Sequence, residues 1–316
     1  MKERKHFMDW AKFFGLYLIV LGHYIPNWTY SPIATYLYTF HVPLFFIVSG
    51  YFAKEKTGIK DSKKIATTLI VPYILLVLLG YALDMLFCGI NAHNILQRGF
   101  LMVIGDPVGL VNPMWFVYTL LMVRFIWIIE CDIEKKLGVH GGLCILFILI
   151  LCVNSLFHFD LIPSFVGRIL IAYPLFFVGY LMSRFKLIDI INPYFFICLI
   201  LLPLLATRIN GVVDIYSFKV GKSVLLFYIF AITTSFGWIC LFKSILNINS
   251  GLINTIVTGS LIIVAFHKFF LRLIFNSLDE SLLFQLIIPL LVIAILYYPI
   301  KWIQKNVPIL IGKRKV

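Results

Sequence analysis

Repeated apolar stretches constrain this chain more than any other feature of its sequence. A helix needs about 20 mostly apolar residues to cross a bilayer, and ten stretches reach or approach that length. They lie at approximately residues 8–26, 36–53, 65–87, 113–130, 141–158, 166–183, 190–207, 222–242, 252–275 and 281–303. We therefore predict an all-α polytopic transmembrane bundle of about ten spans, with one membrane domain over residues 1–316 and no separate soluble domain.

The composition agrees with a membrane location. Of the 316 residues, 61% are hydrophobic and 13% are charged, whereas a typical soluble domain has about 25% charged residues. The segment 93–104 is short and amphipathic, so we expect it to lie on the membrane surface or to re-enter. The six cysteines are scattered without C-x-x-C pairs or Cys/His ligand spacing, and we predict no metal site.

The distribution of basic residues predicts an orientation. With ten spans, 18 of the 27 Lys and Arg residues fall on the side that carries both termini, six on the opposite side and three within spans. Cytoplasmic loops carry an excess of Lys and Arg. We expect both termini in the cytoplasm, the chain in the bacterial cytoplasmic membrane, and no nucleic-acid partner despite the net charge of +13.

The first span carries three ionisable residues, which are expensive in hydrocarbon and are therefore candidates for function. In the stretch "DWAKFFGLYLIVLGH", these are Asp9, Lys12 and His23. Eleven residues bring His23 back to within roughly 20° of Lys12 on a helix, and Asp9 lies about 60° to the other side. The three share one face, which predicts a wall of a polar passage in which Asp9 and Lys12 pair. An interhelical ion pair with a separate histidine is the alternative.

The second span adds a histidine at a similar depth. His41 in "TFHVPLFFIVSGYF" lies a turn or two from the side opposite the termini, as does His23 on the antiparallel first span. Two histidines at one level on adjacent helices predict a shared site. Ser49-Gly50 permits a close helix approach. His267 and Lys268 in the ninth span and Arg124 in the fourth are weaker candidates, and we expect an acidic partner for Arg124.

These segments together resemble the acyltransferase-3 family of integral membrane O-acyltransferases. Lys12 and His23 match its basic residue, ten-residue spacer and histidine, and Phe40-His41-Val42-Pro43 matches its Phe-His-Met-Pro-like motif with valine for methionine. "NPMWFVYTLL" from Asn112, "GVVDIY" from Gly211 and "VTGSLIIVAFHKFF" resemble later segments of the family. The basic pattern usual after the second span is represented here only by lysines.

The resemblance implies O-acetylation, in which an acetyl group moves from cytoplasmic acyl-CoA to a sugar hydroxyl of a cell-surface polysaccharide or its precursor. Acetyl-CoA is then the donor substrate and no cofactor stays bound. The implied catalytic residues are His23, His41, Lys12 and Asp9. The implied contacts to coenzyme A are Arg4, Lys12, Lys60, Lys63 and Lys64, and those to the acceptor are Asp214, Tyr216 and Trp115.

The resemblance leaves several points open. A separate extracytoplasmic partner is one possibility for completing the transfer, besides the lipid bilayer and a glycan or lipid-linked sugar as partners. Transfer can be direct or can pass through an acyl-histidine. A polytopic transporter or lipid-linked glycan flippase is the alternative function, although such proteins more often have two similar halves, which we do not find here.

Overall fold

A computed structural model describes residues 4–24, 32–55, 63–88, 95–138, 140–157, 162–190, 195–275 and 282–313. Each of the ten predicted spans coincides with a helix or a pair of consecutive helices in these residues. They are α1 (His6–Tyr24), α2 (Pro32–Tyr51), η2 with α4 (Ala66–Ile70 and Val71–Cys88), α6 (Trp115–Leu137), α7 (Gly142–Phe157), α8 (Ser164–Arg184), α10 (Phe196–Ile209), α11 (Val224–Ile245), α12 with α13 (Gly251–Thr258 and Ser260–Phe275) and α14 (Leu282–Asn306).

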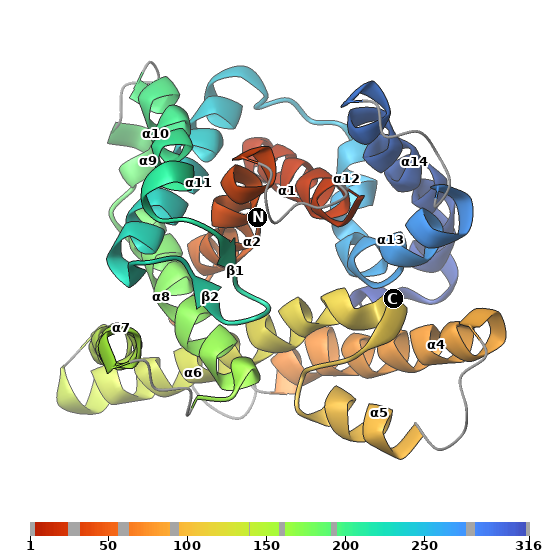
Figure 1. Cartoon of the computed structure of the whole chain (residues 1–316), viewed down its shortest axis with the longest axis horizontal. Coiled ribbons are helices and arrows are strands. Elements are labelled where there is room, and N and C mark those ends of the chain that lie inside the picture. Colours follow the sequence, from red (N-terminus) through yellow and green to blue (C-terminus); the bar gives the residue numbers. More distant parts are fainter. Residues whose placement is uncertain are drawn as a thin grey trace.

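Shorter elements connect these helices. They are α5 (Ile95–Val103), the 3₁₀ helices η4 (Gly109–Met114) and η6 (Pro308–Ile311), α9 (Leu187–Ile190), and an antiparallel hairpin of β1 (Val213–Asp214) and β2 (Lys219–Val220). The predicted amphipathic segment is α5, which lies at the edge of the molecule (Figure 1). Arg98 on α5 donates to the buried Asp84 of α4 at 2.9 Å, and this ion pair fixes α5 to the bundle.

Six of the described helices are long and apolar enough to cross a membrane, or seven if the bent pair α12–α13 counts as one span. The fold is therefore an all-α, multi-pass membrane bundle. The number of ten spans and the side of the termini stay predictions. α10 has 14 residues, which at about 1.5 Å per residue falls short of a hydrocarbon core of about 30 Å. Asp9 and Lys12 lower the hydropathy of α1, which is not among the six helices.

α1 and α2 lie at the centre of the molecule, with the other long helices arranged around them (Figure 1). α2 packs most closely against α8 through two glycines. A Cβ at Gly50 would lie 1.8 Å from the carbonyl oxygen of Phe176, and one at Gly179 would lie 1.9 Å from that of Ile47. Backbone therefore meets backbone on both sides of this contact, which confirms the close approach predicted from Ser49-Gly50.

The two ends of the bundle differ in character. One end, here called the basic end, carries Lys5, Lys54, Arg184 and Lys243, and the other, the hairpin end, carries β1 and β2. At the basic end the backbone N–H of Phe7 donates to Asn247 Oδ1 at 3.3 Å, and Lys5 Nζ donates to the hydroxyl of Tyr51. The start of α1, the end of α2 and the segment after α11 therefore meet there.

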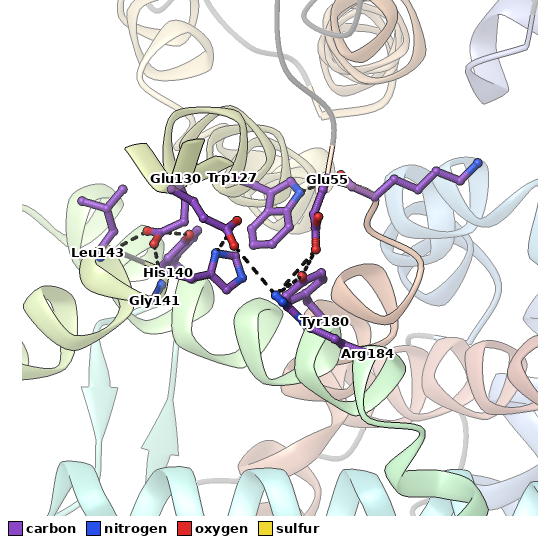
Figure 2. Close-up of polar contacts among 11 residues, drawn as sticks. Glu55, Trp127, Glu130, His140, Gly141, Leu143, Tyr180 and Arg184 are labelled. Atoms are coloured by element: carbon purple, nitrogen blue, oxygen red, sulfur yellow. Dashed lines mark hydrogen bonds and ion pairs between the residues drawn. The ribbon is translucent and has the colours of Figure 1, made fainter. Parts of the chain in front are cut away.

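Polar contacts also join α6, α7 and α8 at the basic end (Figure 2). Glu130 of α6 is completely buried and accepts the backbone N–H groups of Gly141 at 2.6 Å and Leu143 at 3.1 Å. The hydroxyl of Tyr173 donates to the same carboxylate at 3.2 Å. Glu130 thus satisfies backbone donors at the start of α7, as a capping side chain does, and a carboxylate is favoured at that helix terminus.

The segment that follows α2 is held by side chains from the basic ends of α6 and α8. Trp127 Nε1 donates to the carbonyl of Lys54 at 3.0 Å, and the hydroxyl of Tyr180 donates to Glu55. Arg184 reaches both Tyr180, at 2.8 Å, and Glu55, at 3.6 Å (Figure 2). These contacts determine the path of the chain beside the cavities described below.

The α2–α8 contact generates a prediction about stability. Gly50→Ala is expected to lower the free energy of unfolding by about 1–3 kcal/mol or more, the range typical of overpacking. The reason is that the added methyl group meets backbone atoms. Thermal unfolding of detergent-purified protein, followed by tryptophan fluorescence, measures this. Gly99→Ala is the matched control, since nothing lies within 4 Å of its Cβ position and alanine favours a helix. Equal melting temperatures for the two variants would contradict the prediction.

Candidate active site

One cavity at the hairpin end brings together five residues predicted from the sequence. Its volume is about 260 Å³, and we call it the histidine cavity. The predicted residues are His23 from α1, His41 from α2, Trp115 at the start of α6, and Asp214 and Tyr216 from the hairpin. The other lining residues are Ile19, Tyr38, Val42, Asn112, Pro113, Phe116, Ile215, Val264 and Lys268.

His23 has two basic neighbours from α13. The rings of His23 and His267 lie with their centroids 5.0 Å apart and their planes tilted by 36°. His267 is completely buried, whereas His23 is accessible at the cavity. Lys268 lines the same cavity and, like His41, is close enough to interact electrostatically with His23. His267 and Lys268 were weak candidates from the sequence because a single histidine near a helix end is common. Their position relative to His23 depends on the bend between α12 and α13.

His41 and His267 have the same internal arrangement. Nδ1 of each ring lies 2.7 Å from the carbonyl oxygen four residues earlier, that of Leu37 for His41 and that of Ile263 for His267. A carbonyl only accepts, so Nδ1 carries the hydrogen and Nε2 of a neutral ring is left as an acceptor. Nε2 of His267 has no hydrogen-bond partner in the described part of the chain. His41, of assigned tautomer, thus lines the cavity with the accessible His23, and the buried His267 packs against His23 without lining the cavity.

Arg168 of α8 holds the outer wall of the cavity in place. Its side chain is 2% exposed, and its guanidinium donates to the carbonyl of Tyr216 at 2.7 Å and to Asp106 at 3.0 Å. The same guanidinium lies 4.2 Å from the ring centroid of Tyr216 and 5.4 Å from that of Trp115. Arg168 was not among the site residues predicted from the sequence. Its isolation in an apolar helix is the signal that identifies it, because a buried arginine needs partners.

The two hairpin residues differ in what they offer to a ligand. Asp214 already accepts the backbone N–H of Tyr216 at 3.1 Å and the hydroxyl of Ser217 at 2.5 Å, so its carboxylate first stabilises the hairpin. Tyr216 presents its ring to Trp115, with centroids 5.9 Å apart. Burial raises the pKa of the Tyr216 phenol, so its hydroxyl stays protonated and can donate a hydrogen bond.

Two further cavities lie toward the basic end. One, of about 360 Å³, is lined by Lys12 and Arg124, and the other, of about 330 Å³, by Lys54, Lys64 and Arg124. Both share four lining residues, which are Ser49, Phe52, Thr68 and Arg124. We call the two together the basic cavities. No aspartate or glutamate is among their described lining residues.

Among the residues that the structure describes, the cations of the basic cavities form no direct ion pair with a carboxylate. Arg124 Nη2 donates to the hydroxyl of Ser49 at 3.2 Å, and the ammonium of Lys12 lies 4.7 Å from the ring centroid of Phe52. The acidic partner expected for Arg124 is therefore wrong for the described residues, where a neutral hydroxyl takes that position. Uncompensated cations beside a cavity favour an anionic ligand.

The predicted direct ion pair of Asp9 with Lys12 is not found among the described residues, although Asp9 is close enough to interact electrostatically with Lys12. Asp9 forms its ion pair with Nε of Arg4, at 2.6 Å, and no ion pair joins it to Lys12 within the residues that the structure describes. Arg4 lies before α1, and its guanidinium contacts the Asp9 carboxylate in the first turn of that helix. Asp9 and Arg4 line none of the cavities described above, Lys63 is exposed outside them, and Lys60 lies outside the described residues.

One face of α1 connects the two groups of cavities, as its residue spacing predicts. Lys12 and Leu16 line a basic cavity, and Ile19 and His23 line the histidine cavity. Phe116 of α6 and Val264 of α13 line both cavities and therefore stand between them. Phe116 packs against Phe46, with ring centroids 5.0 Å apart. The described residues contain no group of three His, Cys, Asp or Glu side chains that could hold a metal ion.

The position of Arg168 generates a prediction about the outer wall. Arg168→Met is expected to lower the free energy of unfolding by about 3 kcal/mol, the low end for breaking a buried ion pair, because Asp106 is 26% exposed. Faster hydrogen exchange of residues 213–220 should accompany this loss. Arg208→Met makes the same change at an exposed position of α10 and is the control. Unchanged hydrogen exchange of residues 213–220 in Arg168→Met would contradict a positioning role for Arg168.

Comparison with known proteins assigns a family to this arrangement. The model of the acyltransferase-3 family, described as an acyltransferase domain, matches residues 5–302. No curated protein and no solved structure gives a significant match to the chain. The matched range includes all lining residues of the histidine cavity, all those of the basic cavities except Ile311 and Gly312, and nearly every described helix. The chain therefore belongs to the acyltransferase-3 family, and it is a multi-pass membrane acyltransferase.

Proposed function

We propose that the protein transfers an acetyl group from cytoplasmic acetyl-CoA to a sugar hydroxyl of a cell-surface polysaccharide or its precursor. The observation that carries this proposal is the alignment of the basic cavities with the histidine cavity along one face of α1. A donor with several phosphates and an acceptor with only hydroxyls require chemically different sites. The two ends of this alignment differ in that way.

The basic cavities suit the donor. Coenzyme A is polyanionic, and Lys12, Arg124, Lys54 and Lys64 line these cavities without acidic residues among the described lining residues. Charge-assisted hydrogen bonds to phosphate are stronger than neutral ones, and Arg and Lys provide them in different geometries. Their position at the end rich in Lys and Arg agrees with a cytoplasmic donor, both termini in the cytoplasm and the bacterial cytoplasmic membrane as location.

The histidine cavity suits the chemical step. A ring nitrogen of His23 takes the proton of the acceptor hydroxyl while the hydroxyl oxygen attacks the thioester carbonyl carbon. The carbon–sulfur bond then breaks, and the protonated His23 returns the proton to the departing thiolate. His267 and His41 hold Nδ1 against backbone carbonyls, so that Nε2 of each neutral ring is an acceptor suited to receive or orient a proton on His23. An acyl-histidine intermediate on His23 would use the same geometry.

The outer wall of the histidine cavity suits a sugar. Trp115 and Tyr216 provide apolar ring surface, while Asn112 and Asp214 provide amide and carboxylate groups at its margin. A sugar ring presents C–H groups on its faces and hydroxyls at its edge, so such a mixture fits both. The glycan itself is an extracytoplasmic or lipid-linked acceptor in this proposal, with or without a separate partner protein that completes the transfer.

The direct test uses membranes that contain the protein, radiolabelled acetyl-CoA and a surface-glycan acceptor. His23→Ala is expected to reduce acetyl transfer by about 10²–10⁴-fold, the contribution typical of a positioned general base. His6→Ala, which removes a histidine outside the described cavities, should leave transfer unchanged. Intact transfer by a stably folded His23→Ala variant would refute the catalytic role. Movement of a separately labelled glycan across the membrane without acetyl transfer would favour a transporter.

The basic cavities generate a separate prediction for the donor. Lys12→Gln and Arg124→Gln are each expected to raise KM for acetyl-CoA about tenfold or more, because a charge-assisted contact to phosphate is lost. Steady-state transfer at saturating acceptor measures this value. Lys301→Gln makes the same charge change at an exposed position of α14 and should leave KM unchanged. Equal KM values in all variants would argue against donor binding in these cavities.

Phe116 generates a prediction about the acyl group. Its ring stands between the donor and histidine cavities, so Phe116→Ala is expected to raise transfer of butyryl relative to acetyl groups. The comparison uses the two acyl-CoA donors under identical conditions, with Phe100→Ala on the exposed face of α5 as control. An unchanged ratio in a variant that still transfers acetyl would contradict a limiting role for this side chain.

A further inference from the structure

A separate cavity at the hairpin end lies on the other side of the hairpin from the histidines. It has a volume of about 510 Å³ and shares no lining residue with the histidine cavity. Its wall comes from the last turns of α7, the segment after α10, the strand β2 and the start of α11. The lining residues are Leu151, Asn154, Ser155, Asn210, Gly211, Val212, Phe218, Lys219, Val220, Gly221, Lys222 and Val224.

The lining of this cavity is cationic and polar. Lys219 and Lys222 are both exposed, and none of the described lining residues is acidic. Neither lysine forms an ion pair within the described residues. Asn154 and Ser155 add neutral polar side chains to this lining. The lining therefore fits an anionic group that also carries hydroxyls.

The cavity borders helices whose outer faces are apolar and exposed. Leu149 and Val153 of α7 are exposed next to Asn154 along the chain, and Leu225 of α11 is exposed next to Val224. Ile209, the last residue of α10, is exposed directly before Asn210. In a membrane protein such apolar faces contact lipid tails, and helix ends lie at the level of the lipid head groups. The position favours a lipid over a soluble ligand.

The hairpin that separates the two cavities is held firmly. Asn210 Nδ2 donates to the carbonyl of Val220 at 2.9 Å, and the backbone N–H of Ser223 donates to Asn210 Oδ1 at 2.8 Å. In the strand register, Lys219 lies opposite Asp214, which lines the histidine cavity. A ligand at the lysines is therefore one strand away from the wall of the candidate active site.

We infer that this cavity binds the phosphate head group of an anionic membrane lipid, with Lys219 and Lys222 at the phosphate and the polar side chains of Asn154 and Ser155 beside the head-group hydroxyls. The lipid tails then lie along the exposed faces of α7 and α11. This site is independent of the acyl-transfer reaction proposed above. It predicts that the protein prefers phosphatidylglycerol, which has both a phosphate and free hydroxyls, over a zwitterionic lipid.

The test measures bound lipid directly. Purified full-length protein is placed in nanodiscs of phosphatidylcholine with a small fraction of fluorescent phosphatidylglycerol, and energy transfer from tryptophan reports binding. Changing both lysines, Lys219→Gln with Lys222→Gln, is expected to weaken binding about 30-fold, because one lysine near an anionic lipid contributes roughly a fivefold factor. Lys301→Gln with Lys305→Gln makes the same charge change on exposed residues of α14 and should leave binding unchanged.

Two additional measurements distinguish a lipid head group from soluble phosphate and test the cavity without changing the lysines. Ser155→Phe fills the cavity but keeps both lysines and adds no tryptophan to the assay, and it should reduce phosphatidylglycerol binding as well. Inorganic phosphate at millimolar concentration should compete weakly. Complete displacement of the lipid by inorganic phosphate would identify a soluble phosphate site instead. Equal binding of the lipid by wild type and by the double lysine variant would overturn the proposal, as would no preference over phosphatidylcholine in the wild type.

Discussion

The structure depends on one constraint, which is that ionisable side chains on a membrane helix must avoid hydrocarbon. α1 carries Lys12 and His23 on one face, and that face lines cavities at both ends of the bundle. A helix with this face has to lie inside the bundle, and α1 does so beside α2 (Figure 1). The surrounding helices then provide the lipid-facing surface, with apolar side chains exposed on α4, α7 and α14. The central position of α1 thus follows from its chemistry.

The hairpin end is organised by a second buried charge. Arg168 is anchored in α8, yet its partners are Asp106 before α6 and the backbone of Tyr216 in the hairpin. Two segments far apart in the sequence are joined by one guanidinium that also stacks on aromatic rings. Planar arginine with several donors suits such a position better than lysine does. The outer wall of the candidate active site therefore depends on a residue that does not itself line the cavity.

Local sequence patterns predicted much of this molecule. The helices follow from apolar length, and the shared face of Lys12 and His23 follows from helical spacing. The shared site of His23 and His41 followed from their similar depth on adjacent spans. Its completion by Trp115, Asp214 and Tyr216 was available only through the family resemblance, because it depends on how distant segments fold together. Local spacing alone misled for Asp9, since Arg4 forms the direct ion pair with its carboxylate. The partners of His267, Arg168 and Glu130 depend on how helices pack, which local patterns do not encode, although the isolation of Arg168 in an apolar helix marks that residue.

Phe116 and Val264 also have a consequence for the membrane that contains this protein. Water and ions can enter polar cavities from both sides of a bilayer, and a continuous aqueous path would dissipate ion gradients. Two apolar side chains between the basic cavities and the histidine cavity interrupt such a path. Under the proposed reaction, the acyl group would pass this barrier while attached to its carrier. The barrier would thereby preserve the electrical insulation of the membrane during turnover.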